Sequence, residues 1–327
     1  MRGGYTSGEK WEKVEEDGNN YIGPKYDHIP VLVEEVVAGL HCRPGGVYVD
    51  CTIGQGGLAA RILDAAGPSG MLIGIDRDEE ALAMTRERLK PFTTQLRLVH
   101  GNFGEIKQHI QTLGFSCVDG IVFDLGVSSV QLNDANRGFS FMAEGPLDMR
   151  MDRSGETTAA QLLERLSEVE LSNIIFQYGE ERYARRIARA IARARELRRL
   201  RTTADLVSVI RSAVPGSYRH GRIHFATRTF QALRIAVNGE LDVLADAFRD
   251  AADVLCPGGR LCIISFHSLE DRIAKHTIRE LSQGPEPVLL TKTKRPVVAL
   301  ESEVTGNPRS RSAKLRIAER LPQRRCA

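Results

Sequence analysis

The sequence lacks the features of a membrane or secreted protein. No apolar run approaches the roughly 20 residues that a helix needs to cross a bilayer. Residues 1–26 are polar and glycine-rich, without the apolar centre of a signal peptide. We therefore expect a cytoplasmic protein with no membrane partner, in which residues 1–26 form a flexible leader ahead of the folded part.

Cysteine is sparse, and its spacing excludes the common cysteine frameworks. The six cysteines are scattered without any C-x-x-C pair: Cys42, Cys51, Cys117, Cys256, Cys262 and Cys326. This spacing supports neither a zinc site nor a set of disulfides, and most free cysteines in proteins are buried small apolar residues. We expect that role here and predict no metal site.

Net charge is also small, at +3 over 327 residues, but the basic residues are unevenly placed. Lysine and arginine crowd into residues 182–201 and 292–325. Such local clusters create a positive field that attracts an anionic partner, whatever the net charge of the chain.

Short apolar runs alternate with segments of helical periodicity in the first part of the chain. Buried strands are predicted at residues 47–52, 71–76, 96–100 and 118–124, with helices at residues 31–40, 58–66, 78–90 and 105–113. Strands and helices that alternate at this spacing indicate βαβ units, and therefore a parallel sheet in an α/β fold.

This alternation stops after residue 126 and resumes near the C-terminus. Residues 158–212 have only helical periodicity, a helix is predicted at residues 238–255, and strands follow at residues 259–266, 287–292 and 313–319. The sequence thus predicts four parts: the leader at residues 1–26, the α/β core at 27–135, an inserted helical domain at 136–225, and the rest of the core at 226–327.

A glycine-rich turn follows the first predicted strand. Gly54, Gly56 and Gly57 allow the backbone to approach a ligand closely, and the helix that begins there offers free N–H groups to an anion. The segment also fits the dinucleotide pattern G-x-G-x-x-A. The glycines alone therefore do not distinguish NAD from S-adenosylmethionine.

The ends of the next three strands carry further candidates for this site. Asp76 could accept hydrogen bonds from ribose hydroxyls, or it could cap the next helix. Phe103 could cover an adenine ring or simply pack in the core. Asp124 ends the fourth strand at the edge where α/β sheets bind ligands.

Together with the segments that follow, these residues resemble the bacterial 16S ribosomal RNA cytosine-N4 methyltransferases, which act near the decoding site. The resemblance lies in residues 28–32, 50–57, 76–78, 101–103, 124–129, 137–141, 145–152, 178–181, 228–235 and 265–272. It implies a class I, Rossmann-like S-adenosylmethionine-dependent methyltransferase core with an inserted helical domain. It further implies methyl transfer from S-adenosyl-L-methionine to N4 of a cytidine in 16S ribosomal RNA, within the small ribosomal subunit.

The resemblance also implies which residues contact the cofactor. These are Gly56, Gly57, Leu58, Asp76, Phe103, Asp124 and Gln131, to which the glycine turn adds Gly54. The sequence departs from the usual family pattern at three positions. Leu58 stands where histidine is common, Val130 where proline is, and Asn133 where aspartate is. Leu58 can still offer its backbone N–H, but an imidazole contact there is lost.

Two residues are candidates for accepting the proton of the target amine. Asp124 could polarise the amine as it becomes tetrahedral, or it could serve only to bind the cofactor. His267 follows the fifth strand and could titrate near neutral pH, or it could be a structural histidine at the strand-to-helix turn.

Arginines of the insert are candidates for contacting RNA phosphates. Arg182, Arg186, Arg189 and Arg193 recur at helical spacing, and the alternative is an ordinary solvated face. Arg137, Arg150, Arg228 and Arg272, which lie in the segments of resemblance, complete the set. The stretch at residues 145–152 could order a lid over the target base or form a salt-bridged hinge.

Two other classes of protein share part of this pattern. An NAD-linked oxidoreductase would have the glycine turn, but it leaves the basic insert unexplained. A non-catalytic ribosome-assembly factor could retain both the cofactor fold and the basic surface. The oligomeric state is not predicted.

Overall fold

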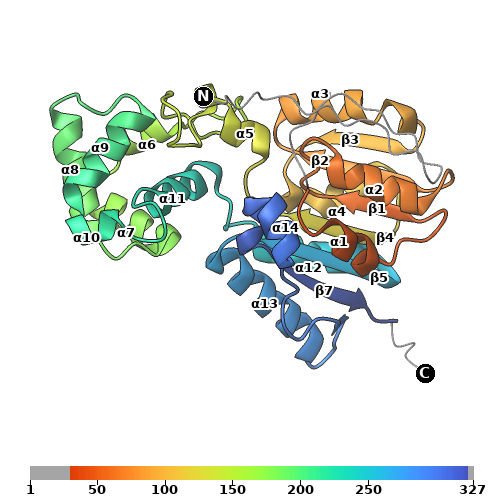
Figure 1. Ribbon diagram of the computed structural model, residues 1–327. Coiled ribbons are helices and arrows are strands. Elements are labelled where there is room, and N and C mark those ends of the chain that lie inside the picture. The colour runs from red at the N-terminus through yellow and green to blue at the C-terminus, as the bar shows by residue number, and fades with distance from the viewer. Residues whose placement is uncertain (1–29, 323–327) are drawn as a thin grey trace, which may run out of the picture.

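A seven-stranded sheet forms the centre of the protein in the computed structural model, which describes residues 30–322 (Figure 1). The predicted leader lies outside this range. The strand order is β3-β2-β1-β4-β5-β7-β6, in which β7 runs antiparallel to both β5 and β6 and all other neighbouring strands are parallel. The strands are β1 Val47–Asp50, β2 Met71–Asp76, β3 Leu96–His100, β4 Val118–Asp124, β5 Leu255–Ser265, β6 Leu289–Thr291 and β7 Lys314–Arg320. The prediction of an α/β core with a parallel sheet is confirmed.

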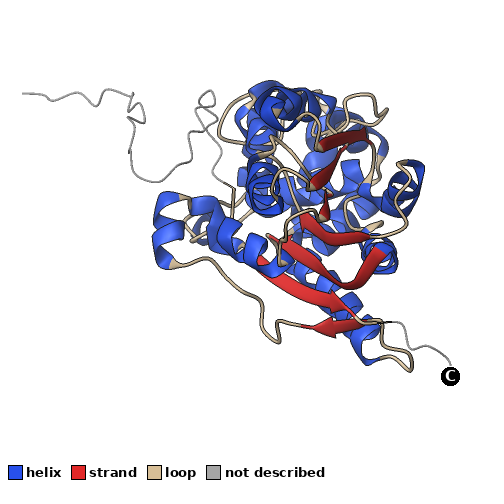
Figure 2. Ribbon diagram, turned by 90° about the vertical axis from the view of Figure 1, so that its right-hand side faces the viewer, coloured by secondary structure: helices blue, strands red, loops and turns tan. Residues whose placement is uncertain are grey.

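Helices cover both faces of the sheet because successive strand residues point to opposite sides. Tyr48 packs in one hydrophobic cluster and Val49 in another, and both side chains are fully buried. The first cluster lies under α1 (Val33–Leu40), α2 (Gly57–Ala66) and α3 (Glu79–Arg88). The second lies under α4 (Ile106–Thr112), α12 (Leu244–Val254) and α13 (Ser268–Gln283). The strands in Figure 2 show the twisted sheet between these two layers.

The helix predicted at residues 238–255 is shorter than expected. The preceding helix α11 (Thr227–Asn238) ends at Gly239, whose φ of +58° is the left-handed conformation that glycine adopts most easily. Helix α12 therefore begins only at Leu244. Strand β5 begins at Leu255, not at residue 259, and its pairing with β4 shifts register between Val118 and Gly120.

A separate group of helices leaves the core after β4 and returns before β5 (Figure 1). It comprises α6 Ala159–Arg165, α7 Glu168–Gly179, α8 Ala184–Glu196, α9 Thr203–Ala213 and α10 Gly216–Arg219. These helices share a third hydrophobic cluster. That cluster also includes Phe230 and Leu233 of α11, which packs along α7, so the helical layer continues beyond residue 225. The boundaries of the four predicted parts stay a prediction.

The inserted helices begin where short polar side chains satisfy their free N–H groups. Thr158, Ser167 and Thr202 each form a capping box with the residue three positions later. Helix α8 then buries one apolar stripe and leaves its arginines outside. Ile187 and Ile191 are fully buried, whereas Arg189 is exposed.

Short elements complete the chain around the sheet. They are α5 Ser129–Asn133, α14 Glu301–Gly306 and the 3-10 turns Lys90–Phe92, Phe103–Glu105, Ala135–Arg137 and Pro308–Ser312. Between residues 30 and 322, no helix is both long and apolar enough to cross a membrane.

The expectation that the cysteines form no disulfide is wrong for one pair. Cys117 and Cys256 are bonded to each other. Each lies one residue from the pair Val118 and Leu255, where β4 and β5 begin side by side, so the sheet brings together cysteines that are 139 residues apart. Cys51 and Cys262 are buried as expected, Cys42 is half-buried, and Cys326 lies outside the described residues.

The prediction that Arg137 contacts RNA needs correction, because its side chain is buried. Only 1% of the residue is exposed, and its guanidinium pairs with Asp78 at 2.8 Å and with Glu80 at 3.1 Å. It also donates to the carbonyl oxygens of Arg150 and Met151. Arg137 therefore joins the start of α3 to the segment that leads into the insert.

We expect Arg137→Ala to lower the free energy of unfolding by about 3–5 kcal/mol, because it leaves Asp78 buried without its counter-ion. Urea denaturation followed by circular dichroism measures the loss. Arg153→Ala is the matched control: Arg153 also pairs with Glu80, but half of its side chain is exposed, so its removal should cost below about 1 kcal/mol. Equal losses for the two variants would contradict this role.

Candidate functional site

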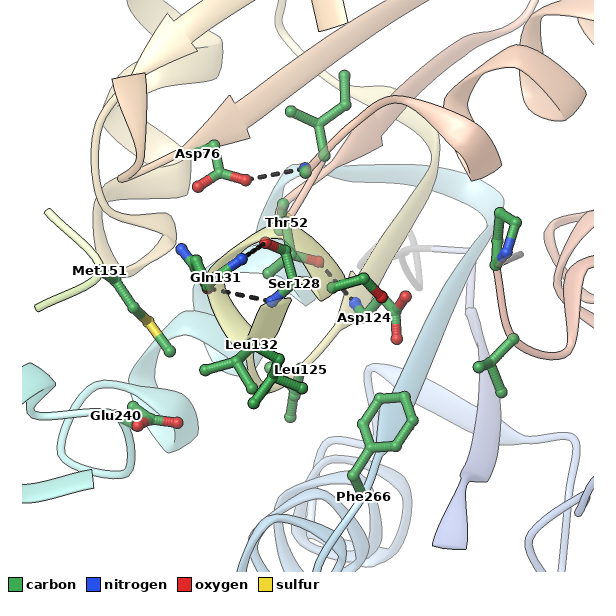
Figure 3. A pocket seen from close by; sticks show the side chains of 18 of the residues that line it. Thr52, Asp76, Asp124, Leu125, Ser128, Gln131, Leu132, Met151, Glu240 and Phe266 are labelled. Carbon is green, nitrogen blue, oxygen red and sulfur yellow. Dashed lines mark hydrogen bonds between the residues drawn. The ribbon is translucent and has the colours of Figure 1, made fainter. Parts of the chain in front are cut away.

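A cavity of ≈ 510 Å³ opens at the carboxyl ends of β1, β2 and β4 (Figure 3). Parallel strands end at the same edge of a sheet, which is where α/β proteins bind ligands. Seven of the eight predicted cofactor residues line this cavity: Gly54, Gly57, Leu58, Asp76, Phe103, Asp124 and Gln131. The sheet therefore gathers into one place side chains that are separated by up to 77 residues in the sequence. Gly56, the eighth, does not line the cavity.

The glycine turn between β1 and α2 has the backbone conformation that its sequence predicts. Gly54 and Gly56 have φ values of +50° and +71°, which only glycine adopts easily. A Cβ on Gly56 would also lie 3.1 Å from side-chain atoms of Thr85 and Leu89. Gly57 begins α2, and a Cβ there would meet Pro30 at 2.6 Å. Any other residue at Gly56 or Gly57 would therefore collide with its neighbours.

Asp76 lies at the end of β2 with its carboxylate in the cavity wall. Its two oxygens accept hydrogen bonds from the N–H groups of Gly54 at 2.8 Å and Asp78 at 2.9 Å (Figure 3). The alternative role of Asp76 as a helix cap is wrong, because the side chain of Asp78 caps α3. Burial raises the pKa of Asp76 to about 6 even though these N–H donors lower it.

Phe103 and Gln131 form the wall beside Asp76. The Phe103 ring packs edge-to-face on Phe123 of β4 at 5.6 Å, so it serves the core and also borders the cavity. Gln131 donates from Nε2 to Asp78 at 2.8 Å and accepts at Oε1 from the N–H of Ser128. These bonds fix the amide, which leaves it little freedom to move when a ligand binds.

Asp124 presents a carboxyl group with an unused oxygen to this site. Its backbone N–H donates to Oγ1 of Thr52 at 2.8 Å, whereas its Oδ1 is sealed from solvent and has no hydrogen-bond partner among residues 30–322. Burial, together with the nearby carboxyl groups of Asp50 and Glu270, raises the pKa of Asp124 to about 8. A sealed acceptor beside an open cavity is suited to a ligand that brings its own N–H or O–H group.

Asp50 is a site residue that the sequence interpretation did not single out. It ends β1 with 1% of the residue exposed, and it lines the same cavity as Asp124. Burial raises its pKa to about 7, although the N–H of Thr52 donates to it. Its position as the acid directly before the glycine turn could have identified it. Asp50 and Asp124 together make the cavity favourable to a cation.

His267 caps α13, which supports its structural alternative. Its Nδ1 accepts from the N–H of Glu270, and its Nε2 lies 3.1 Å from Oε1 of the Glu270 side chain. The imidazole does not line the cavity, whereas Glu270 does. Burial alone would raise the pKa of Glu270, but the hydrogen bond from His267 and the charge of Arg234 lower it overall. His267 thus acts on the cavity only through Glu270.

The inserted helices supply the opposite wall of the cavity. Arg234 of α11, whose side chain is 15% exposed, pairs with Glu240 at 2.7 Å, and both residues line the cavity. Met151 and Thr227 line it as well. Asn238 holds this wall in place, because its side chain accepts from the N–H of Met151 and donates to the carbonyl oxygen of Met149. The sequence interpretation missed these residues because none of them follows a strand.

The remaining arginines predicted to contact RNA fall into two groups. Arg150, Arg228 and Arg272 are engaged within the protein: Arg150 with Asp148, Arg228 with the carbonyl oxygen of Glu180, and Arg272 with the carboxylate of Glu180. Arg150 also donates to carbonyl oxygens of residues 153 and 155, so it holds its own loop.

The second group consists of exposed arginines on α8 and just before it. Arg182 lies over the rings of Tyr183 and Tyr218, at 4.8 Å and 4.9 Å. Arg186, Arg189 and Arg193 border a second hollow, which shares no residue with the cavity at the sheet. These side chains remain candidates for RNA contact.

The raised pKa of Asp124 has a consequence for stability. Its pKa is about 3.8 in the unfolded chain and about 8 in the folded protein, so rising pH ionises the unfolded state first and destabilises the fold. Asp124→Asn removes this cost. We expect the variant to be more stable than the parent by about 1–3 kcal/mol at pH 8, and by less at pH 5.

Urea denaturation at the two pH values measures this difference. Asp64→Asn is the matched control, because Asp64 is exposed on α2 and its replacement should change the stability little at either pH. A variant of Asp124 that is less stable than the parent at pH 8 would show that the carboxylate is stabilised in the fold.

Comparison with known proteins agrees with the geometry of the site. The MraW methylase family matches residues 25–321. A protein named ribosomal RNA small subunit methyltransferase H from Pelobacter propionicus is 51% identical over 90% of this chain and 99% of its own. A protein of the same name from Sorangium cellulosum is 53% identical over 90% of this chain and 91% of its own.

Solved structures resemble the chain more distantly. An rRNA methylase from Streptococcus thermophilus aligns with a TM-score of 0.43 at 12% identity, covering 90% of this chain and 99% of the other. That likeness is too remote to support a functional argument. The identity to the curated relatives and the match over nearly the whole chain show that the protein belongs to the MraW methylase family, and its cofactor is S-adenosyl-L-methionine.

Proposed function

We propose that this protein transfers a methyl group from S-adenosyl-L-methionine to the exocyclic N4 of a cytidine in 16S ribosomal RNA, near the decoding site. The names of its relatives support ribosomal RNA of the small subunit as the substrate. The observation that carries the chemistry is Asp124, whose sealed and unpartnered oxygen lies in the wall of the cavity that also holds Asp76. A cytoplasmic location, where ribosomes are assembled, fits this substrate.

The residues of the cavity fit the cofactor. Asp76 can accept hydrogen bonds from ribose hydroxyls, Phe103 offers an aromatic edge to an adenine, and the turn at Gly54 exposes backbone groups. Bound there, the cofactor supplies an electrophilic methyl group on a positively charged sulfur. Asp50 and Asp124 stabilise positive charge in this cavity, and a cation between them lowers the pKa of both.

The N4 amine is a poor nucleophile because its lone pair is delocalised into the cytosine ring. An enzyme can help by holding the amine in line with the methyl group, by excluding water, and by accepting a proton. Leu125, Leu132 and Phe266 give the cavity an apolar side next to Asp124 (Figure 3). Asp124 can then accept a hydrogen bond from the amine and take up its proton. The positive charge of the cofactor lowers the pKa of Asp124 from about 8, which favours the carboxylate form that a base needs near neutral pH.

The target cytidine has to leave its stack to reach this cavity, which is bordered by Met151 and by Thr227 and Arg234 of α11. Arg234 and Glu240 border the space from the insert side. They are charged groups that already neutralise each other, so they can donate and accept hydrogen bonds to a base edge without a large electrostatic cost.

Transfer of a labelled methyl group to small-subunit RNA, followed by mass spectrometry of the nucleosides, tests the proposal. We expect the label on N4-methylcytidine with the parent protein. Asp124→Asn should reduce the single-turnover rate at saturating cofactor by about 100-fold or more, because the acceptor of the proton is lost. Asp64→Asn is the matched control and should keep the parent rate.

Three other outcomes of this assay would each contradict one part of the proposal: the target atom, the catalytic activity or the role of Asp124. Label on another atom would overturn the assignment to N4. Cofactor binding without any transfer would instead indicate a non-catalytic assembly factor. A parent-like rate for Asp124→Asn would restrict Asp124 to binding the cofactor.

We further expect Asp76→Asn to weaken the binding of S-adenosylmethionine by about 10- to 100-fold, since a hydrogen bond to a charged acceptor contributes about 1.5–3 kcal/mol. Isothermal titration calorimetry with the cofactor alone measures this loss. Glu79→Gln removes a neighbouring exposed carboxylate and is the control, with an expected affinity like that of the parent. Unchanged affinity for Asp76→Asn would place the ribose elsewhere.

A further inference from the structure

A basic hollow of ≈ 770 Å³ lies between α8 and α9, on the part of the insert farthest from the sheet (Figure 1). Six arginines and a single aspartate border it. Arg186, Arg189 and Arg193 come from α8, and Arg198, Arg199 and Arg201 come from the turn that joins α8 to α9. We refer to these fourteen lining residues, which run from Arg186 to Ala213, as the arginine groove.

The positive charge of the groove is not neutralised within the described part of the chain. Arg186, Arg193, Arg198 and Arg199 form no ion pair there, and Arg189 has only a long contact to Glu168 at 3.3 Å on the surface. The one acid of the groove, Asp205, is engaged in capping α9, where it accepts from the N–H groups of Arg201 and Thr202. Six cations held this close repel one another, so the groove gains stability when it binds an anion.

The chemistry of the lining indicates what kind of anion fits. Apart from arginine and Asp205, the residues are alanine, leucine, valine and serine, and none is aromatic or carries an amide. Proteins that hold single-stranded RNA usually stack its bases on aromatic rings. The groove offers no such ring, and its guanidinium groups and serine hydroxyls match phosphate oxygens.

We infer that the arginine groove binds the phosphodiester backbone of a helical RNA segment separate from the strand that carries the target base. The inference rests on the proposed RNA substrate. The groove and the catalytic cavity share no residue, so an RNA that occupies both has to extend from one to the other. Base-paired RNA is recognised mainly through its backbone and shape. A basic surface without aromatic or amide side chains suits this kind of recognition. The substrate is then a folded RNA, and a short strand around the target base binds more weakly.

A triple variant, Arg193→Ala with Arg198→Ala and Arg199→Ala, tests this inference. The matched control replaces three exposed arginines outside the insert, Arg86, Arg97 and Arg279, by alanine. Binding is measured by fluorescence anisotropy with two labelled probes that lack the target cytidine: an RNA hairpin and an unstructured single strand of equal length. The full chain is used throughout, and calorimetry with S-adenosylmethionine checks that the cavity is intact.

The groove variant should bind the hairpin roughly tenfold more weakly or worse at fixed salt, and its salt dependence should be shallower by about 2–3 in the log–log slope. Its affinity for the single strand should fall much less, and the control variant should match the parent with both probes. Hairpin binding equal to that of the parent would overturn the inference. An equal loss with both probes would overturn the assignment to helical RNA.

This test is independent of the proposed methylation. The probes contain no target base, so a protein that proves to methylate another atom still gives a clear binding result. In the transfer assay, the groove variant should raise the KM for a long folded RNA and leave the rate at saturating RNA unchanged. A lower saturating rate with an unchanged KM would place the three arginines in the catalytic step and overturn their assignment to the groove.

Discussion

The buried ion pair between Arg137 and Asp78 is the interaction on which the arrangement of this protein depends. Asp78 caps α3, accepts a hydrogen bond from Gln131 and lies two residues after Asp76. Arg137 also donates hydrogen bonds to the backbone carbonyl oxygens of residues 150 and 151, where the chain enters the insert. One guanidinium therefore fixes the edge of the sheet, the cavity wall and the start of the helical domain relative to one another. Because both charges are out of water, neither partner can be removed without a large cost.

The cavity achieves its function at the expense of stability. Burial raises the pKa of Asp50 to about 7 and that of Asp124 to about 8. The charge of Asp76 adds to the shift of Asp50, and the charges of Asp50 and Glu270 add to that of Asp124. Glu270 nearby is kept ionised by His267 and Arg234. Three carboxyl groups around one space are unfavourable in an empty protein and favourable around a cation. The site thus prefers the positively charged cofactor over the product from which that charge has been lost, which helps the product to leave.

Periodicity and strand ends predicted most of the core, but charged residues were harder to interpret. Strands β2, β3 and β4 have the predicted bounds, and Asp76, Phe103 and Asp124 meet at one cavity because parallel strands end together. Arg137 and His267 look functional in sequence, since arginine and histidine are common in active sites. Only the fold shows that one is buried in an ion pair and the other caps a helix. The disulfide between Cys117 and Cys256 was hidden for a similar reason, because sequence spacing gives no information on which strands are neighbours.

The point at which the helical domain is inserted explains how the arginine groove and the cavity at the sheet can bind parts of one RNA, as we propose. The helical domain leaves the core after β4 and rejoins it at α12, whose first residue Leu244 lines the same cavity as Asp124, so both connections lie beside this cavity. Asn238 and Glu180 tie the insert back to the core, the first by hydrogen bonds to the segment at residues 149–151 and the second through Ser268 and Arg272. An RNA held at the far side of the insert is therefore held at a fixed distance from the cavity. A rigid connection of this kind selects RNA by shape. The proposed contacts of the arginine groove, which has no aromatic or amide side chain, then direct the cavity to one site in a large RNA.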